Sequence, residues 1–190
     1  IAIILDGNRR WAKKHGMPAI FGHRKGAETL EKIVRGANKL GLQYMTVYCF
    51  STENWKRSST EVDELMNLLR QNLSRMVEDN IRVKFIGESD MLPADIVEQA
   101  KKMEKDSAAN TAMTLCVALS YGSRFEIVAA AKKVASLVKS GDISVNDIDV
   151  DLFSGMLYTA SIPDPDLLIR TSGEQRISNY LLWQMAYTEF

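Results

Sequence analysis

The chain has 190 residues, a length that fits one domain with a core of its own. Hydrophobic residues make up 46% and charged residues 25%, which is ordinary for a soluble globular protein. The longest apolar runs are far shorter than the roughly 20 residues of a membrane span. Lys and Arg number 24, as do Asp and Glu. This zero net charge argues against a general nucleic-acid binder, whose domains are usually strongly basic.

The charges are unevenly distributed along the chain. Residues 1–40 hold nine Lys or Arg against three acidic residues, whereas residues 140–169 hold six Asp and no basic residue. A local cationic cluster suits a small anionic ligand. The alternative is that the amino-terminal charges form a solvated helix face.

Short apolar runs alternate with amphipathic segments from one end of the chain to the other. We predict strands at Ile1–Leu5, Tyr44–Phe50, Ile81–Ile86, Met113–Leu119 and Leu167–Arg170. We predict helices at Lys25–Leu40, Val62–Val77, Ile96–Met103, Phe125–Val138 and Leu152–Tyr158. A capping box, Ser58-x-x-Glu61, is expected to start the second of these helices. Alternation of this kind, with strands apolar on both faces, predicts an α/β fold in which helices flank a parallel sheet.

The two cysteines, Cys49 and Cys116, lie inside predicted strands and form no C-x-x-C pair. Isolated cysteines in apolar segments indicate buried, reduced thiols. We therefore expect a cytosolic protein.

Polar, small and basic residues follow four of the predicted strands. These segments are 6–11, 51–57, 120–124 and 171–179. Ligands of parallel α/β sheets bind beyond the carboxyl ends of the strands. The four loops should therefore converge on one anion-binding site.

The first loop reads Asp6-Gly7-Asn8-Arg9-Arg10. Gly7 allows a tight turn, free N–H groups at a helix start attract phosphate, and arginines suit phosphate oxygens. An acid in such a loop would repel phosphate unless a cation intervened, so Asp6 is interpreted as a Mg²⁺ ligand that bridges to a diphosphate. The alternative is that Asp6 caps the helix.

The last loop places Arg170, Arg176 and Ser178 close together. Two such cations repel each other unless they share a polyanion or pair with Glu174. His23 precedes Arg24 in a glycine-flanked segment and is interpreted as a phosphate donor rather than a general base. A histidine of the core or of the surface fits the spacing equally well.

Several motifs together resemble the cis-prenyltransferases, and most closely the bacterial undecaprenyl diphosphate synthase group. In order, they are Asp6-Gly7-Asn8-x-Arg10-Trp11-Ala12, Gly22-His23-x-x-Gly26, Tyr48-x-Phe50-Ser51-Thr52-Glu53-Asn54-Trp55-x-Arg57, Asn110-Thr111, Tyr121-Gly122-x-Arg124, Pro163-Asp164-Pro165-Asp166 and the stretch Leu167–Asn179. The resemblance runs from Ile1 to Phe190. It identifies residues 1–190 as one catalytic domain of this kind.

The resemblance implies a central six-stranded parallel sheet with a hydrophobic tunnel for the growing chain. It implies a Mg²⁺-dependent enzyme that condenses isopentenyl diphosphate sequentially onto farnesyl diphosphate. The product would be an undecaprenyl-type diphosphate, the lipid carrier precursor for cell-wall glycan synthesis. A cytoplasmic homodimer is implied as well, with peripheral membrane contact at product release and no nucleic-acid partner.

Site residues follow from the resemblance, position by position. For the allylic diphosphate these are Gly7, Asn8, Arg9, Arg10 and His23; for isopentenyl diphosphate they are Arg170, Arg176 and Ser178. Trp11 and Ile177 are expected to bind substrate as well. Substrate-binding positions in the loop after the second strand are Ser51, Thr52, Glu53, Trp55 and Arg57. Asp6 and Glu189 correspond to the Mg²⁺ contacts, with Asp6 counted as catalytic. Asn54 corresponds to the proposed proton-abstraction residue, but an amide is a poor base, so we expect it to orient substrate or a phosphate oxygen.

The chain departs from the family pattern in three places. Ala19 stands where the family usually has Arg, the helix near Leu69–Arg70 is about one turn short, and Phe190 precedes the family's Arg-x-Gly segment. The helices at Lys25–Leu40 and Val62–Val77 either line the tunnel or form simple core. The competing functions are a non-catalytic subunit of a heteromeric enzyme and a synthase of shorter or longer chains.

Overall fold

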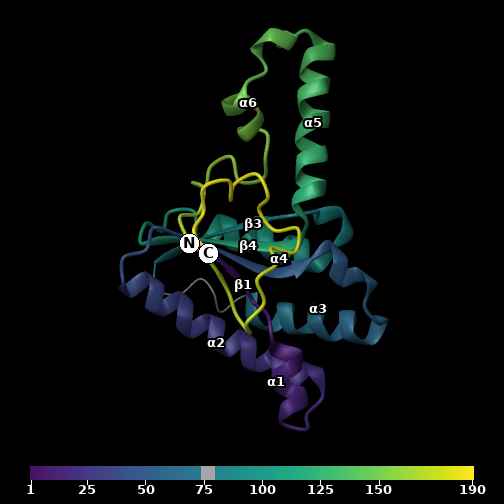
Figure 1. Ribbon diagram of the computed structural model, residues 1–190, viewed down its shortest axis with the longest axis vertical. Coiled ribbons are helices and arrows are strands. Elements are labelled where there is room, and N and C mark those ends of the chain that lie inside the picture. Colours follow the sequence, from purple (N-terminus) through teal and green to yellow (C-terminus); the bar gives the residue numbers. More distant parts are fainter. Residues whose placement is uncertain (74–79) are drawn as a thin grey trace.

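A computed structural model describes residues 1–73 and 80–190 and contains a five-stranded parallel sheet (Figure 1). The strands are β1 (Ala2–Ile4), β2 (Tyr44–Ser51), β3 (Ile81–Ile86), β4 (Met113–Tyr121) and β5 (Leu168–Arg170). Their order across the sheet is β3-β4-β2-β1-β5. Because all pairs are parallel, the loops that follow the strands leave from one edge of the sheet.

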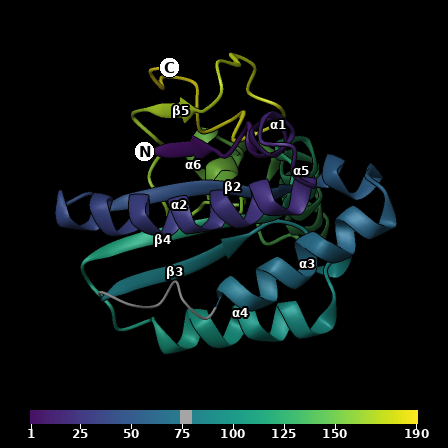
Figure 2. The ribbon, with the colours of Figure 1, turned by 90° about the horizontal axis from the view of Figure 1, so that it is seen from below.

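Three helices cover one face of the sheet, as seen from below in Figure 2. They are α2 (Ala19–Lys39), α3 (Ser59–Leu73) and α4 (Ala94–Asp106). Their apolar stripes pack against every second side chain of the strands, including Val47, Val83 and Leu115, which are fully or almost fully buried. This packing follows from the strand and helix periodicities that the sequence predicts.

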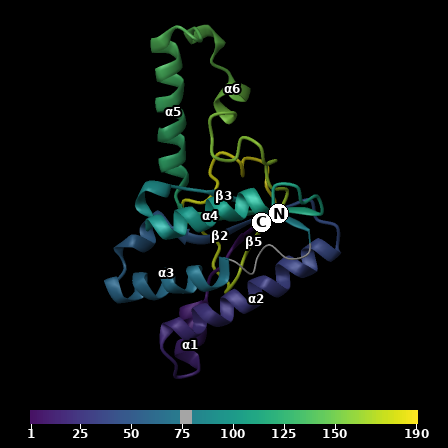
Figure 3. The ribbon, with the colours of Figure 1, turned by 180° about the vertical axis from the view of Figure 1, so that it is seen from behind.

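The opposite face of the sheet is covered mainly by the segment that ends the chain. Tyr180, Leu181 and Met185 pack there against Tyr48 and Cys116. Helix α5 (Ser123–Ser140) projects away from the sheet, with the short α6 (Val150–Ser154) beside it (Figures 1 and 3). Helix α1 (Asn8–Lys14) packs on the start of α2, and three 3₁₀ helices, η1 (Thr52–Lys56), η2 (Ser89–Met91) and η3 (Val145–Asp147), complete the described elements.

The predicted α/β fold is confirmed, but the sixth strand that the resemblance implied is not part of the sheet. Beside β5, the described residues form a single parallel bridge between Leu167 and Glu189, one residue before the last. One bridge is too short to count as a strand. The five strands predicted from the residues all lie within two residues of their observed bounds.

Several predicted helices differ at their ends. Helix α2 begins at Ala19, directly after Pro18, rather than at Lys25. Residues 74–77 of the predicted second helix lie outside the described part. The last helix begins two residues earlier than predicted, at Val150, because the Asp149 carboxylate caps it through the Leu152 N–H (2.8 Å), and it ends at Ser154 rather than Tyr158.

The capping box predicted at the start of α3 is only half formed. The Glu61 N–H donates to Ser58 Oγ at 3.3 Å, but the Glu61 carboxylate faces three basic side chains instead of the helix end. No helix among the described residues is both long and apolar enough to cross a bilayer.

Candidate active site

Two glycines on α2 let the loop after β1 approach this helix closely. A Cβ at Gly22 would lie 1.9 Å from the Asn8 carbonyl oxygen, and one at Gly26 would lie 2.5 Å from the Asn8 side chain. Gly7 turns the loop itself with φ of 95°. The Gly-His-x-x-Gly spacing is therefore explained by packing: it seats Asn8 against α2, with His23 beside it.

The loop after β1 is tied directly to the loop after β5. The Asp6 N–H donates to Thr171 Oγ1 at 3.0 Å, and that hydroxyl lies 2.6 Å from the Asp6 carbonyl. The Asp6 carboxylate accepts a 2.9 Å hydrogen bond from Arg170 Nη2 and also lies 3.3 Å from Arg10 Nη2. Since β1 and β5 are neighbours, these contacts join two loops that are more than 160 residues apart in sequence.

Asp6 is ionised at neutral pH. Burial alone would raise the pKa of its carboxyl, but hydrogen bonds from Arg170 and the Gly7 N–H, together with the charges of Arg170 and Arg10, lower the pKa below its ordinary value. The expectation of a helix cap is wrong, because the cap position of α1 is Gly7 and has no side-chain bond. The Gly7 N–H is not free for phosphate either, since it donates to Asp6 Oδ1 at 2.6 Å.

The cations of the last loop are all paired with groups of the protein. Arg170 Nη1 donates to Ser178 Oγ at 2.7 Å and to the Arg176 carbonyl. One carboxylate oxygen of Glu174 accepts a hydrogen bond from Arg10, and the other accepts one from Arg176. The internal arginine–glutamate pair considered from the sequence therefore exists for Arg176, while Arg170 pairs with Asp6 instead.

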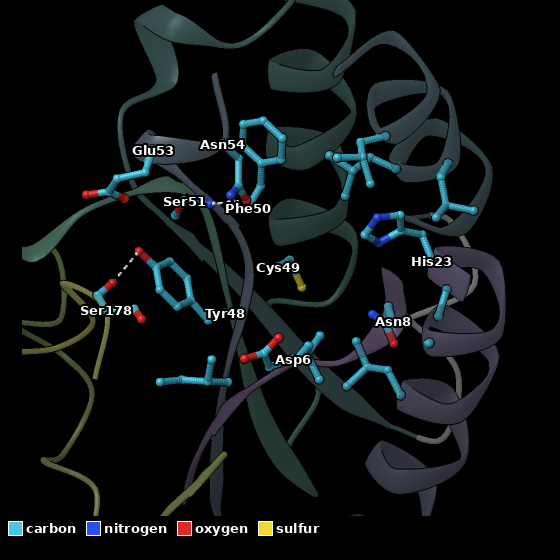
Figure 4. Close-up of a pocket in the computed structure, with 18 of the residues that line it drawn as sticks. Asp6, Asn8, His23, Tyr48, Cys49, Phe50, Ser51, Glu53, Asn54 and Ser178 are labelled. Carbon is cyan, nitrogen blue, oxygen red and sulfur yellow. Dashed lines mark hydrogen bonds between the residues drawn. The ribbon is translucent and has the colours of Figure 1, made fainter. Parts of the chain in front are cut away.

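The loop after β2 presents Asn54 as a hydrogen-bond donor (Figure 4). The Ser51 N–H donates to Asn54 Oδ1 at 3.0 Å, which fixes the orientation of the side-chain amide. Its Nδ2 group is therefore the end left for a ligand. This geometry agrees with an orienting role and not with a base.

Glu53, in the same loop, accepts a 2.9 Å hydrogen bond from Asn179 Nδ2. Burial would raise the pKa of Glu53, but this bond and its other hydrogen bonds lower it on balance. Glu53 is therefore a second ionised carboxylate at this edge of the sheet.

Glu61 gathers three basic side chains at the start of α3. Its carboxylate lies 2.8 Å from Arg57, 3.7 Å from Arg9 and 3.9 Å from His23 Nε2. Burial, and then the charges of Arg57 and Arg9 against that of Glu61, lower the pKa of His23, so the ring is neutral at pH 7. His23 Nε2 is buried and has no hydrogen-bond partner, which leaves it available to a ligand.

Two cavities meet at these residues. One, of about 560 Å³, runs from Asp6, Arg170 and Ser178 between α2 and α3, where its lining is mostly apolar: Ala27, Leu30, Cys49, Phe50, Leu65, Leu68 and Leu69. The other, of about 580 Å³, is lined by basic residues: Arg9, Arg10, Lys13, Arg57 and Arg176. Asp6, Asn8, His23 and Arg57 line both. The helices α2 and α3 thus contribute both to the core and to the lining of an apolar cavity.

Besides Glu189, four residues predicted at the site line neither cavity. Trp11 stacks on His15, with ring centroids 4.2 Å apart, and lines a separate groove with Ile33. Trp55 donates to Ser120 Oγ at 2.9 Å and packs on Phe50. Thr52 is buried, and Ile177 packs against the core on the opposite face. The structure brings together the other predicted residues of the three loops and α2.

Glu189 is not brought to Asp6. Its bridge to Leu167 places it at the amino end of β5, whereas Asp6 follows the carboxyl end of β1. A Mg²⁺ ion shared by these two carboxylates does not fit this arrangement.

The described residues contain no cluster of three His, Cys, Asp or Glu side chains that would form a ready-made metal centre. Mg²⁺, however, is commonly held by one or two carboxylates together with substrate phosphates and water. Asp6 fits that mode, because its carboxylate is ionised and lines both cavities.

Sequence reasoning missed Tyr48, Cys49, Glu61 and Asn179 as site residues. All except Glu61 line the apolar cavity. Cys49 faces it from inside a strand, where residue type carries no functional signal, whereas Tyr48 begins a recognised motif and was within reach of prediction. Burial raises the pKa of the Cys49 thiol to about 12, so it remains protonated, as expected for a buried thiol. Asn179 was within reach of prediction, since it adjoins Ser178 in a recognised motif.

The structure is thus a parallel α/β protein in which a basic cavity and a largely apolar cavity share residues at the carboxyl edge of the sheet. Comparisons with known proteins make this specific. The family profile described as "Putative undecaprenyl diphosphate synthase" matches residues 4–190. Isoprenyl transferases of Bacillus subtilis and Clostridium perfringens are 50% and 49% identical over the whole chain, which covers 75% and 77% of those proteins.

Two solved structures are similar as well. Lavandulyl diphosphate synthase from Lavandula x intermedia, in complex with dimethylallyl diphosphate, matches with a TM-score of 0.94 and 39% identity over 100% of this chain and 84% of that one. A probable undecaprenyl diphosphate synthase from Campylobacter jejuni matches with a TM-score of 0.79 and 28% identity over 99% and 82%. This chain belongs to the isoprenyl transferase family.

Proposed function

We propose that the chain condenses isopentenyl diphosphate with farnesyl diphosphate, one unit after another, and forms the new double bonds in the cis configuration. The observation that carries this proposal is the junction at Asp6, Asn8, His23 and Arg57, where the basic cavity opens into the apolar one. A prenyl diphosphate needs such a pair of environments. The dimethylallyl diphosphate named in the lavender structure supports an allylic diphosphate as one ligand.

The allylic diphosphate would bind in the basic cavity, with its prenyl chain between α2 and α3. Arg9, Arg10 and Arg57 would neutralise its charge, and the unpartnered His23 Nε2 would donate a hydrogen bond. Two of these arginines are held by Glu61 and one by Glu174 in the free protein, so the diphosphate must replace those carboxylates.

Isopentenyl diphosphate would bind beside Arg170, Arg176 and Ser178. In the reaction, the C1–O bond of the allylic substrate would break, its diphosphate would leave, and C1 would bond to C4 of isopentenyl diphosphate. C2 of the latter would then give its proton to an oxygen of the diphosphate as the double bond moves from C3–C4 to C2–C3. The Asn54 Nδ2 group would hold the isopentenyl diphosphate in place for this step, since its Oδ1 is already engaged.

Asp6 would hold Mg²⁺ against a diphosphate. When bound, the ion would supply charge neutralisation of the leaving diphosphate. Arg170 keeps Asp6 ionised and oriented for that role.

The descriptions of the family profile and of the Campylobacter jejuni structure, both undecaprenyl diphosphate synthases, support an undecaprenyl-type product, and we propose with it a role in cell-wall glycan synthesis. We propose further that the protein acts as a cytoplasmic homodimer that touches the membrane when it releases product. Light scattering tests the dimer, flotation with liposomes tests the membrane contact, and chromatography of the dephosphorylated product gives its length.

The deciding experiment supplies radiolabelled isopentenyl diphosphate with Mg²⁺ and either farnesyl or dimethylallyl diphosphate. Label in the butanol-extractable fraction that depends on the allylic substrate supports the proposal. No transfer with either acceptor favours the alternative, a non-catalytic subunit.

A further inference from the structure

The segment that carries Ser178 adopts a backbone conformation that L-residues rarely adopt. Ser178, Asn179 and Leu181 have φ values of 51°, 60° and 44°. Left-handed non-glycine residues cost free energy and persist where the surroundings hold them firmly. The contacts that hold this segment therefore decide where Ser178 lies.

Asn179 makes three of those contacts. Its Oδ1 accepts a 3.0 Å hydrogen bond from the Arg124 N–H, and its carbonyl accepts one of 2.8 Å from the Ser123 N–H. Its Nδ2 donates to Glu53 Oε1 at 2.9 Å. The two partners of the amide, a backbone N–H and a carboxylate, fix which end is oxygen and which is nitrogen.

The space around this amide is closely fitted. A Cβ on Gly122 would lie 2.8 Å from Asn179 Nδ2 and 2.6 Å from Thr52 Oγ1. Asn179 thus joins three segments at one point: the loop after β2, the start of α5 and the loop after β5. Ser178, the residue before Asn179, accepts a 2.7 Å hydrogen bond at its Oγ from Arg170 Nη1.

We propose that Asn179 is a positioning residue for the second diphosphate site: its amide bridges Glu53 and α5 and thereby places Ser178 beside Arg170. This inference rests on the proposed function, which assigns that site to isopentenyl diphosphate. No contact described here links Asn179 to Arg9, Arg10 or His23 of the first site. A change at Asn179 should therefore act on one substrate and spare the other.

The test measures binding of each diphosphate alone by calorimetry in the presence of Mg²⁺, since neither can react without the other. In Asn179→Asp, the bond from Arg124 is kept, but a carboxylate oxygen replaces the donor that faces Glu53. We expect the Kd of isopentenyl diphosphate to rise about tenfold to a hundredfold, the effect of one hydrogen bond to a charged group. The Kd of farnesyl diphosphate should change by less than about threefold.

Asn80 offers a matched control at the other edge of the sheet. It is also left-handed, with φ of 58°, and its amide bridges the Thr111 N–H (3.2 Å) and the Thr111 hydroxyl (3.3 Å). Asn80→Asp should leave both Kd values unchanged. Asn179→Gly removes the amide while it relieves the backbone strain, so it should raise the Kd for isopentenyl diphosphate without lowering the Tm.

A reversed pair gives the sharpest readout. In the double variant Glu53→Gln with Asn179→Asp, glutamine becomes the donor and aspartate the acceptor. The double variant should bind isopentenyl diphosphate more tightly than Asn179→Asp alone. Equal effects on both diphosphates, an effect of Asn80→Asp that matches Asn179→Asp, or no recovery in the double variant would overturn the inference. If the unaltered protein binds neither diphosphate, the proposed function itself fails.

Discussion

Four ion pairs of the site fall into two groups that differ in burial, and the pair of Arg57 with Glu61, with side chains 26% and 16% exposed, lies between them. The pair between Asp6 and Arg170 is largely buried, with side chains 25% and 9% exposed. The pairs of Arg10 and Arg176 with Glu174, and of Arg9 with Glu61, involve arginines that are 51%, 63% and 59% exposed. Exposed pairs contribute little to stability, whereas breaking a buried pair is costly because one charge stays behind.

This difference divides the site into two parts. The frame is the buried pair of Asp6 and Arg170, and the exchangeable part consists of the exposed pairs that Glu174 and Glu61 make with arginines. Asp6 and Arg170 lock together the loops after β1 and β5. Glu174 and Glu61 hold the outer arginines only weakly, so a diphosphate with more charge and more acceptor oxygens can take their place. In the structure, the arginines that line the basic cavity are thus paired with carboxylates of the protein itself.

The largest expected effect is at Asp6. Asp6→Ala should reduce turnover about a thousandfold, equivalent to about 4 kcal/mol of lost transition-state stabilisation. Asp6→Asn is the matched control, because it can still accept the Gly7 N–H but lacks the charge; it should be nearly as slow. Steady-state kinetics at saturating Mg²⁺ measure the turnover of both variants. Near-normal turnover of either one would show that Asp6 is not a catalytic residue.

The two arginines of the last loop give the most direct comparison of buried and exposed pairs. Arg170→Ala and Arg176→Ala should each raise the KM for isopentenyl diphosphate about tenfold to a hundredfold and affect farnesyl diphosphate much less. Only Arg170→Ala should also lower the Tm, by about 4–8 °C, because it leaves Asp6 without its buried partner.

Calorimetric scans of both variants check this contrast. Arg176→Ala should melt within about 2 °C of the unaltered protein, as expected for an exposed pair. Equal losses of Tm would mean that the division into frame and exchangeable part is wrong. Equal effects on both substrates would mean that the two diphosphate sites are not separate.

A smaller effect is expected at Arg9 and Ala19, because this chain carries Arg at position 9 and lacks the Arg that the resemblance leads us to expect at position 19. Arg9 and Ala19 line the same basic cavity, and the family usually has Arg at the position of Ala19. Arg9→Gly should raise the KM for farnesyl diphosphate about tenfold. Adding Ala19→Arg should restore part of the loss, which a double-mutant cycle measures as non-additivity. Strictly additive effects, or no response to Arg9→Gly, would leave Arg9 a surface charge without a role.

The sequence predicts the sheet well because strand periodicity and loop composition are local properties. All five runs predicted as strands are apolar on both faces, which predicts a sheet covered by helices but not the order of the strands across it. Helix α6 begins where the Asp149 carboxylate accepts from the Leu152 N–H, a local cap that the prediction overlooked. The close approach of α2 to the loop after β1 depends on the contact of Gly22 with Asn8, a tertiary contact that a sequence pattern does not contain.

The site shows the same limit. Loops after parallel strands meet at one edge, so the convergence of Asp6, Asn54 and Arg170 is predictable. Which cation pairs with which carboxylate is not, because Glu61 leaves its expected capping role and turns toward Arg57 and His23. The predicted contact of Glu189 with a shared Mg²⁺ is wrong for a similar reason. A motif match carries over residue type and order but not the contacts that hold a side chain in place.

The smallest expected effect is at His23, which lies beside Glu61. Burial, Arg57 and Arg9 lower its pKa below the ordinary 6.5 despite Glu61. The unfolded chain therefore binds this proton more readily than the folded one, and stability from His23 is present above about pH 6.5 and lost as the pH falls below it. Urea denaturation between pH 5.5 and 8 should show that His23→Asn loses stability less steeply toward acid than the unaltered protein does. His15→Asn, at the other histidine, is the matched control; if it flattens the profile as much, the effect does not belong to His23.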